Sequence, residues 1–230
     1  MPSLKDCYPG LIDVLARQEA SSRPGPETRP GWEAVLRIAV TRASGESLSR
    51  RVVAALDGAG MMEACALAGT PIGEILDLLA QAGVDAPPRI AALIHRLARW
   101  FSASFPDTSA VEPGNGPVTP ALREELLAIN GIGQGTTDAI LLALGRSSFP
   151  IDPGVYRILV RHGWCDLTAD YDEASETLRR HAGDNPSELA RLANGLSSVG
   201  RRYCGVRAPR CDRCPLLPLL PPSGPIDPHG

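Results

Sequence analysis

Asn130-Gly131-Ile132-Gly133-Gln134-Gly135-Thr136-Thr137 is the most informative segment of this 230-residue chain. Apolar residues precede it at 126–129 and follow it at 140–144, which is typical of two short amphipathic helices. Glycine has no Cβ and adopts positive φ without a steric penalty, so glycines allow a tight turn between helices. The pattern therefore predicts a helical hairpin with backbone N–H groups exposed at the start of its second helix.

The start of that second helix is a candidate anion site. The unpaired N–H groups of a first helical turn and the positive end of the helix dipole both attract phosphate, whatever the base sequence. The residues expected to lie against a phosphate are Gly131, Ile132, Gly133, Gly135 and Thr136. A nucleic-acid backbone is therefore the predicted ligand, and an ordinary helical hairpin is the alternative.

A resemblance to a known family extends beyond the glycine turn. Residues 126–145, followed by Pro150-Ile151-Asp152, resemble the helix-hairpin-helix and following aspartate of the endonuclease III (HhH-GPD) superfamily of DNA glycosylases. The family motif has an apolar lead, Gly-(Val/Ile)-Gly, an apolar helix and an extended segment that ends in Asp. The resemblance implies a monomeric enzyme of base excision repair that acts on double-stranded DNA with a damaged or mismatched base.

The rest of the chain predicts an all-α fold, because helical periodicity dominates and aromatic residues make up only 4%. Thr119 is a predicted N-cap before Pro120, and Gly145 is placed to end the second hairpin helix. The resemblance implies two lobes. The expected parts are a helical barrel at 30–145 that ends in the hairpin at about 120–145, a second lobe of 1–29 plus 146–215 with a cysteine loop at 204–214, and an irregular tail at 216–230.

Composition and charge narrow the class of protein. The hydrophobic content of 43% is ordinary for a soluble globular protein, and the net charge of -3 argues against indiscriminate nucleic-acid binding. No run of eighteen apolar residues exists, so no membrane span is expected. The first eight residues have no apolar signal core, so we expect a cytoplasmic, nucleoid-associated protein. The cations are 22 arginines and the single Lys5, with a C-terminal cluster that predicts a local basic face: Arg201, Arg202, Arg207, Arg210 and Arg213.

Asp152 is the predicted catalytic residue. Breaking an N-glycosidic bond places positive charge on the sugar, and a fixed carboxylate beside C1′ stabilises that charge and can orient or deprotonate water. The resemblance assigns this role to Asp152. Asp152-Pro153 is also a good N-cap followed by proline in the first turn of a helix. The two roles are compatible, and the hairpin upstream favours catalysis.

Two positions depart from the family pattern. Lyase-competent members carry a lysine two residues after the second hairpin glycine, where this chain has Gly135 and therefore no amine for a Schiff base. The resemblance then implies a monofunctional glycosylase that leaves an abasic site. The glutamine that the family uses to fill the gap left by the flipped base corresponds to Ala43, next to Arg42. These losses also support the alternative, a non-catalytic DNA-binding protein derived from the glycosylase fold.

Three cysteines near the C-terminus resemble the family's iron–sulfur loop. Cys204, Cys211 and Cys214 have the spacing C-x6-C-x2-C, but Leu220 stands where the family has its fourth cysteine. A [4Fe–4S] cluster normally takes four ligands. A cluster with a substitute ligand, zinc held by three thiolates and a histidine, and three free thiols without a metal all remain open. The candidate substitute ligands are Cys165, His181 and His229.

Overall fold

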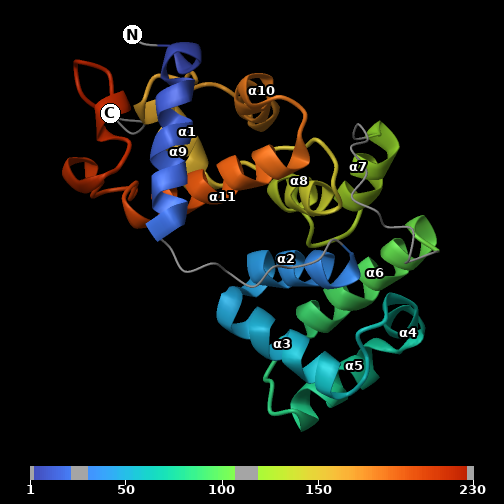
Figure 1. The fold of residues 1–230 in the computed structure, drawn as a ribbon. Helices are drawn as coiled ribbons and strands as arrows, with labels where there is room; N and C mark the ends of the chain where they lie inside the picture. The colour runs from blue at the N-terminus through green and yellow to red at the C-terminus, as the bar shows by residue number, and fades with distance from the viewer. Residues whose placement is uncertain (1–2, 22–30, 107–118, 227–230) are drawn as a thin grey trace. The chain divides into compact units, whose positions relative to one another are not determined.

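The computed structural model describes residues 3–21, 31–106 and 119–226, and Figure 1 draws their ribbon. These residues form α-helices and short 3-10 turns, with no strand among them, so the all-α prediction is confirmed. None of the helices in these ranges is long and apolar enough to cross a membrane. The helices are α1 (Leu4–Ser21), α2 (Trp32–Ser44), α3 (Glu46–Gly58), α4 (Ala64–Gly69), α5 (Ile72–Gln81), α6 (Pro88–Ser104), α7 (Pro120–Leu127), α8 (Gln134–Ala143), α9 (Pro153–Arg161), α10 (Tyr171–Ala182) and α11 (Pro186–Arg202), followed by the 3-10 turns η2 (Cys211–Arg213) and η3 (Leu217–Leu219).

The chain divides into two compact units. The central unit is Thr28–Arg146, and the terminal unit joins Met1–Glu27 to Ser147–Gly230. The central unit therefore holds α2 to α8 and the predicted hairpin. The terminal unit holds α1 and α9 to α11, together with Asp152 and the cysteine loop.

The central unit is built on α2 and α6. Buried residues recur every three or four positions along α6, as an amphipathic helix requires, and include Ile90, Ile94 and Phe101. The rings of Phe101 and Trp32 lie 5.6 Å apart, so they join α6 to the first turn of α2. Helix α2 also contacts α3 and α8, and this packing holds the second hairpin helix against the core of the unit.

The terminal unit depends on a close approach of α9 and α11. A Cβ on Gly200 of α11 would lie 2.8 Å from the carbonyl carbon of Gly154 on α9, nearer than real Cβ atoms come to backbone. Only a pair of glycines allows this packing, because any side chain at Gly200 would separate the two helices. The contact places the N-terminus of α9, where Asp152 lies, beside the C-terminal half of α11.

The C-terminal segment, predicted to be irregular, folds back onto α9. Its described part, to residue 226, contains η3 and buries Leu216 completely. The backbone N–H of Ile226 donates to the carbonyl of Arg161 at 3.0 Å, and Nδ1 of His162 lies 3.1 Å from the carbonyl of Leu219. Burial beneath this segment lowers the pKa of His162. The last part of the predicted tail, 227–230, lies outside the described residues.

Candidate functional site: a helix-hairpin-helix and a capping aspartate

The hairpin is formed by α7 and α8, which begin and end at the capping residues that the sequence predicts. The hydroxyl of Thr119 accepts a hydrogen bond from Leu122 N at the start of α7, with Pro120 as the first helical residue. Gly145 has a φ of 75° just beyond α8, where its N–H donates to Leu142 O at 3.0 Å. The N-terminus of α7 and the C-terminus of α8 therefore both have the hydrogen bonds that capping residues provide.

The turn between α7 and α8 is tight. Ile132 N donates to Ile129 O at 2.9 Å, and Gly131 has a φ of 98°. The side chain of Ile132 is only 7% exposed and anchors the turn in the core of the central unit, while Gly131 and Gly133 are exposed. The turn thus presents backbone to solvent and inserts a single apolar side chain beneath it.

Neighbouring side chains hold the turn in place. Nη2 of Arg96 on α6 donates to Asn130 O at 2.9 Å. Arg123 on α7 and Asp138 on α8 form an ion pair at 3.3 Å, and the carboxylate of Asp138 is buried. Arg96 therefore connects the turn to α6, and the ion pair joins the two hairpin helices to each other. These contacts restrain the hairpin, as a site that presents its amides in a fixed geometry requires.

The N-terminus of α8 is capped by Gly133, which has no side chain to offer. The Gly133 carbonyl accepts from Thr136 N and Thr137 N, each at 2.9 Å. The N–H groups of Gln134 and Gly135 belong to the first turn, where a helix has no internal acceptors. Of the three glycines between Asn130 and Thr136, Gly131 has positive φ, whereas Gly133 has a φ of -106° that other residues also adopt. No atom lies within 4 Å of an ideal Cβ on Gly133, so this glycine keeps open space for a ligand.

Asp152 caps α9, as its pairing with Pro153 indicated. Its Oδ1 accepts from the N–H groups of Gly154 and Val155, both at 2.8 Å. Its Oδ2 accepts from the hydroxyl of Ser197 on α11 at 2.5 Å. The side chain is half-buried, so solvent still reaches it. Three donors fill three of roughly four acceptor positions of a carboxylate, which leaves about one, on Oδ2, for a water or a ligand.

Ser197 was not among the site residues predicted from the sequence. The only signal was its spacing of three residues from Gly200, which places both residues on one face of α11. This spacing indicates that Ser197 lies near Asp152 only when the packing of Gly200 against Gly154 is known.

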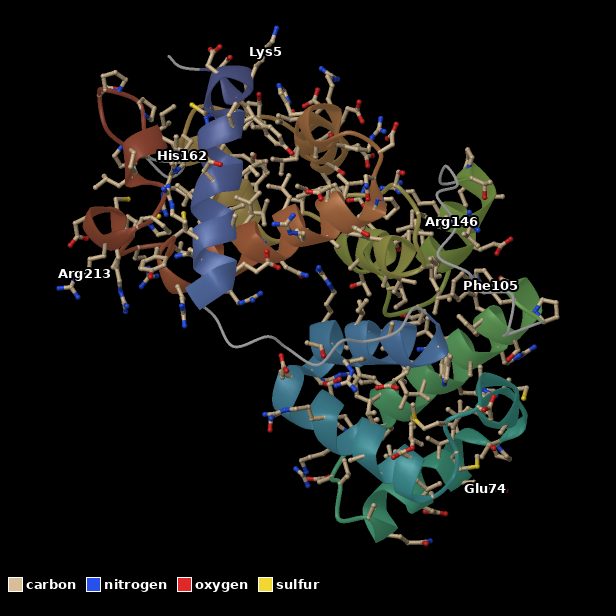
Figure 2. The ribbon with its side chains drawn as sticks, viewed as in Figure 1. Lys5, Glu74, Phe105, Arg146, His162 and Arg213 are labelled. Atoms are coloured by element: carbon tan, nitrogen blue, oxygen red, sulfur yellow. The ribbon has the colours of Figure 1, made fainter. Side chains whose placement is uncertain are left out.

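The departures from the family pattern have clear places in the fold. Gly135 lies in the first turn of α8, and Ala43 and Arg42 are exposed near the end of α2. Lys5 lies in the first turn of α1, in the terminal unit (Figure 2). The arginines predicted to form a basic face, Arg201, Arg202, Arg207, Arg210 and Arg213, are all exposed at the end of α11 and in the cysteine loop.

The three cysteines of the loop lie around one small cavity. Cys204, Cys211 and Cys214 line a space of about 20 Å³ together with Leu220. Burial raises the pKa of the Cys214 thiol and of the Cys211 thiol, and the neighbouring cysteines raise both further. The buried guanidinium of Arg161 donates to Cys204 Sγ at 3.1 Å and to Gly205 O at 2.8 Å. The loop is thus organised around Arg161 and α9.

This arrangement does not fit a four-thiolate cluster. Leu220 lines the cavity where the fourth ligand would be required, and an alkyl side chain cannot bind iron. Cys165 and His181 do not line the cavity, and His229 lies outside the described residues. Within the described ranges, no three His, Cys, Asp or Glu side chains are grouped so that they could hold a metal ion.

Comparisons with known proteins agree with this architecture. No family model matches the chain. Over 92 residues the chain is 36% identical to endonuclease III of Sulfolobus acidocaldarius, a segment that spans 40% of each protein, so the chain matches less than half of that relative's length. A solved endonuclease III–DNA covalent intermediate has a TM-score of 0.68 at 19% identity, with 98% of this chain and 97% of that one covered. A thermostable thymine-DNA glycosylase has a TM-score of 0.68 at 17% identity, covering 92% and 94%. The structural matches establish the fold.

Proposed function

We propose that this chain, which belongs to the endonuclease III-like helix-hairpin-helix (HhH-GPD) superfamily, is a DNA glycosylase of base excision repair. The proposal rests on the hydrogen bonding of the Asp152 carboxylate. Its carboxylate is held by three donors and keeps an acceptor position free. The exposed amides of the α8 N-terminus supply a separate phosphate site in the same chain.

The proposed reaction is hydrolysis of an N-glycosidic bond. The damaged or mispaired nucleotide leaves the duplex stack, at a cost of about a few kcal/mol that falls for weakened pairs. The hairpin amides bind the DNA backbone through a phosphate. As the bond from C1′ to the base breaks, the Asp152 carboxylate stabilises the positive charge on the sugar and orients a water molecule. The water oxygen bonds to C1′, and the base departs with the bonding electrons and takes up a proton.

We also propose that the enzyme is monofunctional. A lyase needs an amine that forms a Schiff base with C1′, and Gly135 provides none at the family's lysine position. Lys5, the only lysine of the sequence, lies in the first turn of α1 and not in the hairpin. The product is therefore an abasic site with an intact DNA strand.

A panel of labelled duplexes tests the proposed function. Each duplex carries one lesion of a class that superfamily members process: an oxidised pyrimidine, an alkylated purine, uracil or a mispaired adenine. We expect one class to give strand breaks after alkali treatment and none before it. Borohydride should trap no covalent adduct, and a trapped adduct would show that the enzyme is a lyase. Binding to lesion duplexes without base release from any of them would identify the alternative, a non-catalytic DNA-binding protein.

The hairpin amides are tested by a pair of glycine substitutions. Gly133→Ala should lower the melting temperature only slightly, because its φ of -106° suits alanine and its Cβ would meet open space, although alanine is a poorer N-cap than glycine. The new methyl group would nevertheless obstruct a phosphate at the α8 N-terminus, so DNA binding should weaken about tenfold, the loss of roughly one charge-assisted hydrogen bond. Binding is measured by fluorescence anisotropy with an undamaged duplex.

Gly131→Ala is the contrasting variant. Its φ of 98° strains any side chain, and its Cβ would lie 3.5 Å from Leu93 Cδ1. It should lower the free energy of unfolding by about 1–2 kcal/mol. If Gly133→Ala bound DNA as tightly as the parent, the hairpin amides would not be the phosphate site.

The cysteine loop, we propose, is maintained without a four-thiolate cluster. Protein purified without oxygen should contain no stoichiometric iron and sulfide, since Leu220 replaces a cluster ligand, and no stoichiometric zinc, since no three His, Cys, Asp or Glu side chains of the described residues are grouped to hold a metal ion. Leu220→Cys supplies the missing thiol and should gain iron, sulfide and a brown colour on reconstitution. Stoichiometric iron and sulfide in the parent protein would contradict the proposal, and stoichiometric zinc would favour a zinc site instead.

A further inference from the structure

In the described part of the terminal unit, Ser197 is the one residue whose side chain forms a hydrogen bond with Asp152. Its hydroxyl donates to Asp152 Oδ2 at 2.5 Å from a position 45 residues further along the chain. Asp152 Oδ1 is already occupied by the two amides of the α9 N-cap. The two carboxylate oxygens are therefore held by different helices, one by α9 and the other by α11.

The geometry that brings Ser197 to Asp152 is built into the helix packing. Gly200 lies one helical turn beyond Ser197, on the same face of α11. It packs against the backbone of Gly154, two residues after Asp152, so close that a Cβ would be 2.8 Å from Gly154. This contact fixes the separation and register of α9 and α11, and with them the distance from the Ser197 hydroxyl to the carboxylate.

We propose that Ser197 is a positioning residue for Asp152, and this inference rests on the proposed glycosylase function. The N-cap amides fix one oxygen of the carboxylate but leave rotation about the Cβ–Cγ bond weakly restrained. The hydroxyl of Ser197 fixes the second oxygen and so sets the plane of the carboxylate and the direction of its remaining acceptor position. A charged hydrogen-bond acceptor held at both oxygens is preorganised for charge that develops in the transition state.

The first measurement compares single-turnover base release by the parent and Ser197→Ala on the substrate that the lesion panel identifies. We expect a loss of about tenfold or more, because small displacements of a catalytic group cost large factors in rate. The dissociation constant for the lesion duplex should be unchanged, since Ser197 is proposed to contact no DNA. Ser197→Thr keeps the hydroxyl and should recover most of the rate.

Ser198→Ala is the matched control. It makes the same change one residue along the same helix, where the side chain lines a cavity between α1 and α11. Its rate should equal that of the parent. A loss in Ser198→Ala as large as that in Ser197→Ala would reduce the effect to a general weakening of α11 and overturn the positioning role.

Thermal unfolding tests the contact independently of activity. Ser197→Ala should lower the melting temperature by about 2–4 °C in the parent, the shift expected for roughly one hydrogen bond in a chain of this size. In the Asp152→Ala background the same change should have a much smaller effect, because the acceptor is already absent. Equal shifts in both backgrounds would overturn the contact.

The outcomes separate the two proposals. An active parent whose rate is unaffected by Ser197→Ala overturns the positioning role and leaves the glycosylase function standing. A parent that releases no base from any duplex overturns the glycosylase function, and the positioning role falls with it. A rate loss recovered by Ser197→Thr, with coupled melting temperatures, supports both.

Discussion

Asp152→Asn should lower the single-turnover rate of base release by about 10²–10³-fold, the loss typical of removing one group that stabilises transition-state charge. Asparagine has nearly the same shape as aspartate and is an equally good N-cap, so its oxygen can still accept from Gly154 N and Val155 N. The substitution therefore removes the charge and keeps the architecture. Rates are measured with enzyme in excess over a lesion duplex, and circular dichroism should give the melting temperature of the parent.

Asp152→Ala separates the capping role from the chemical role. It removes the charge and the cap together, so it should be as inactive as Asp152→Asn and also less stable, by about 0.5–2 kcal/mol. If Asp152→Asn released the base at the rate of the parent, the carboxylate would have only its capping role. The non-catalytic alternative, or a different catalytic group, would then have to be considered.

Gly200→Ala should destabilise the terminal unit and impair catalysis together. The new Cβ would lie 2.8 Å from the Gly154 backbone, so α9 and α11 must separate. Overpacking of this kind costs about 1–3 kcal/mol, and the higher helix propensity of alanine offsets about 1 kcal/mol of it. We expect a net loss of up to about 2 kcal/mol in the free energy of unfolding, measured by urea denaturation. Base release should slow about tenfold, because the Ser197 hydroxyl moves away from Asp152.

Gly73→Ala is the control for helix propensity alone. Gly73 lies in α5 of the central unit, and no atom is within 4 Å of its ideal Cβ. This substitution should be neutral or stabilise the protein by up to about 1 kcal/mol. A Gly200→Ala protein as stable as Gly73→Ala would show that α9 and α11 do not need the glycine contact.

The hairpin shows where sequence reasoning succeeds and where it stops. The glycine turn, the Thr119 cap and the Gly145 stop were all predictable, because each signal acts over a few residues. The separate roles of the two glycines in the turn could not be predicted from the sequence. Gly131 is required by its own backbone angle, whereas Gly133 has an ordinary conformation and keeps space for a ligand. Backbone angles and free space become known only when the turn is placed on α6.

The helical class, the hairpin and the capping aspartate can all be predicted from the sequence, since helical periodicity, capping and turn formation are local properties of the chain. The distant side chains that complete the site are known only from the folded chain. Ser197 reaches Asp152 across 45 residues, and Arg161 reaches Cys204 across 43. These partners are selected by helix packing, above all by the approach of Gly200 to Gly154, and a contact between two helices has no signature in the local sequence of either one.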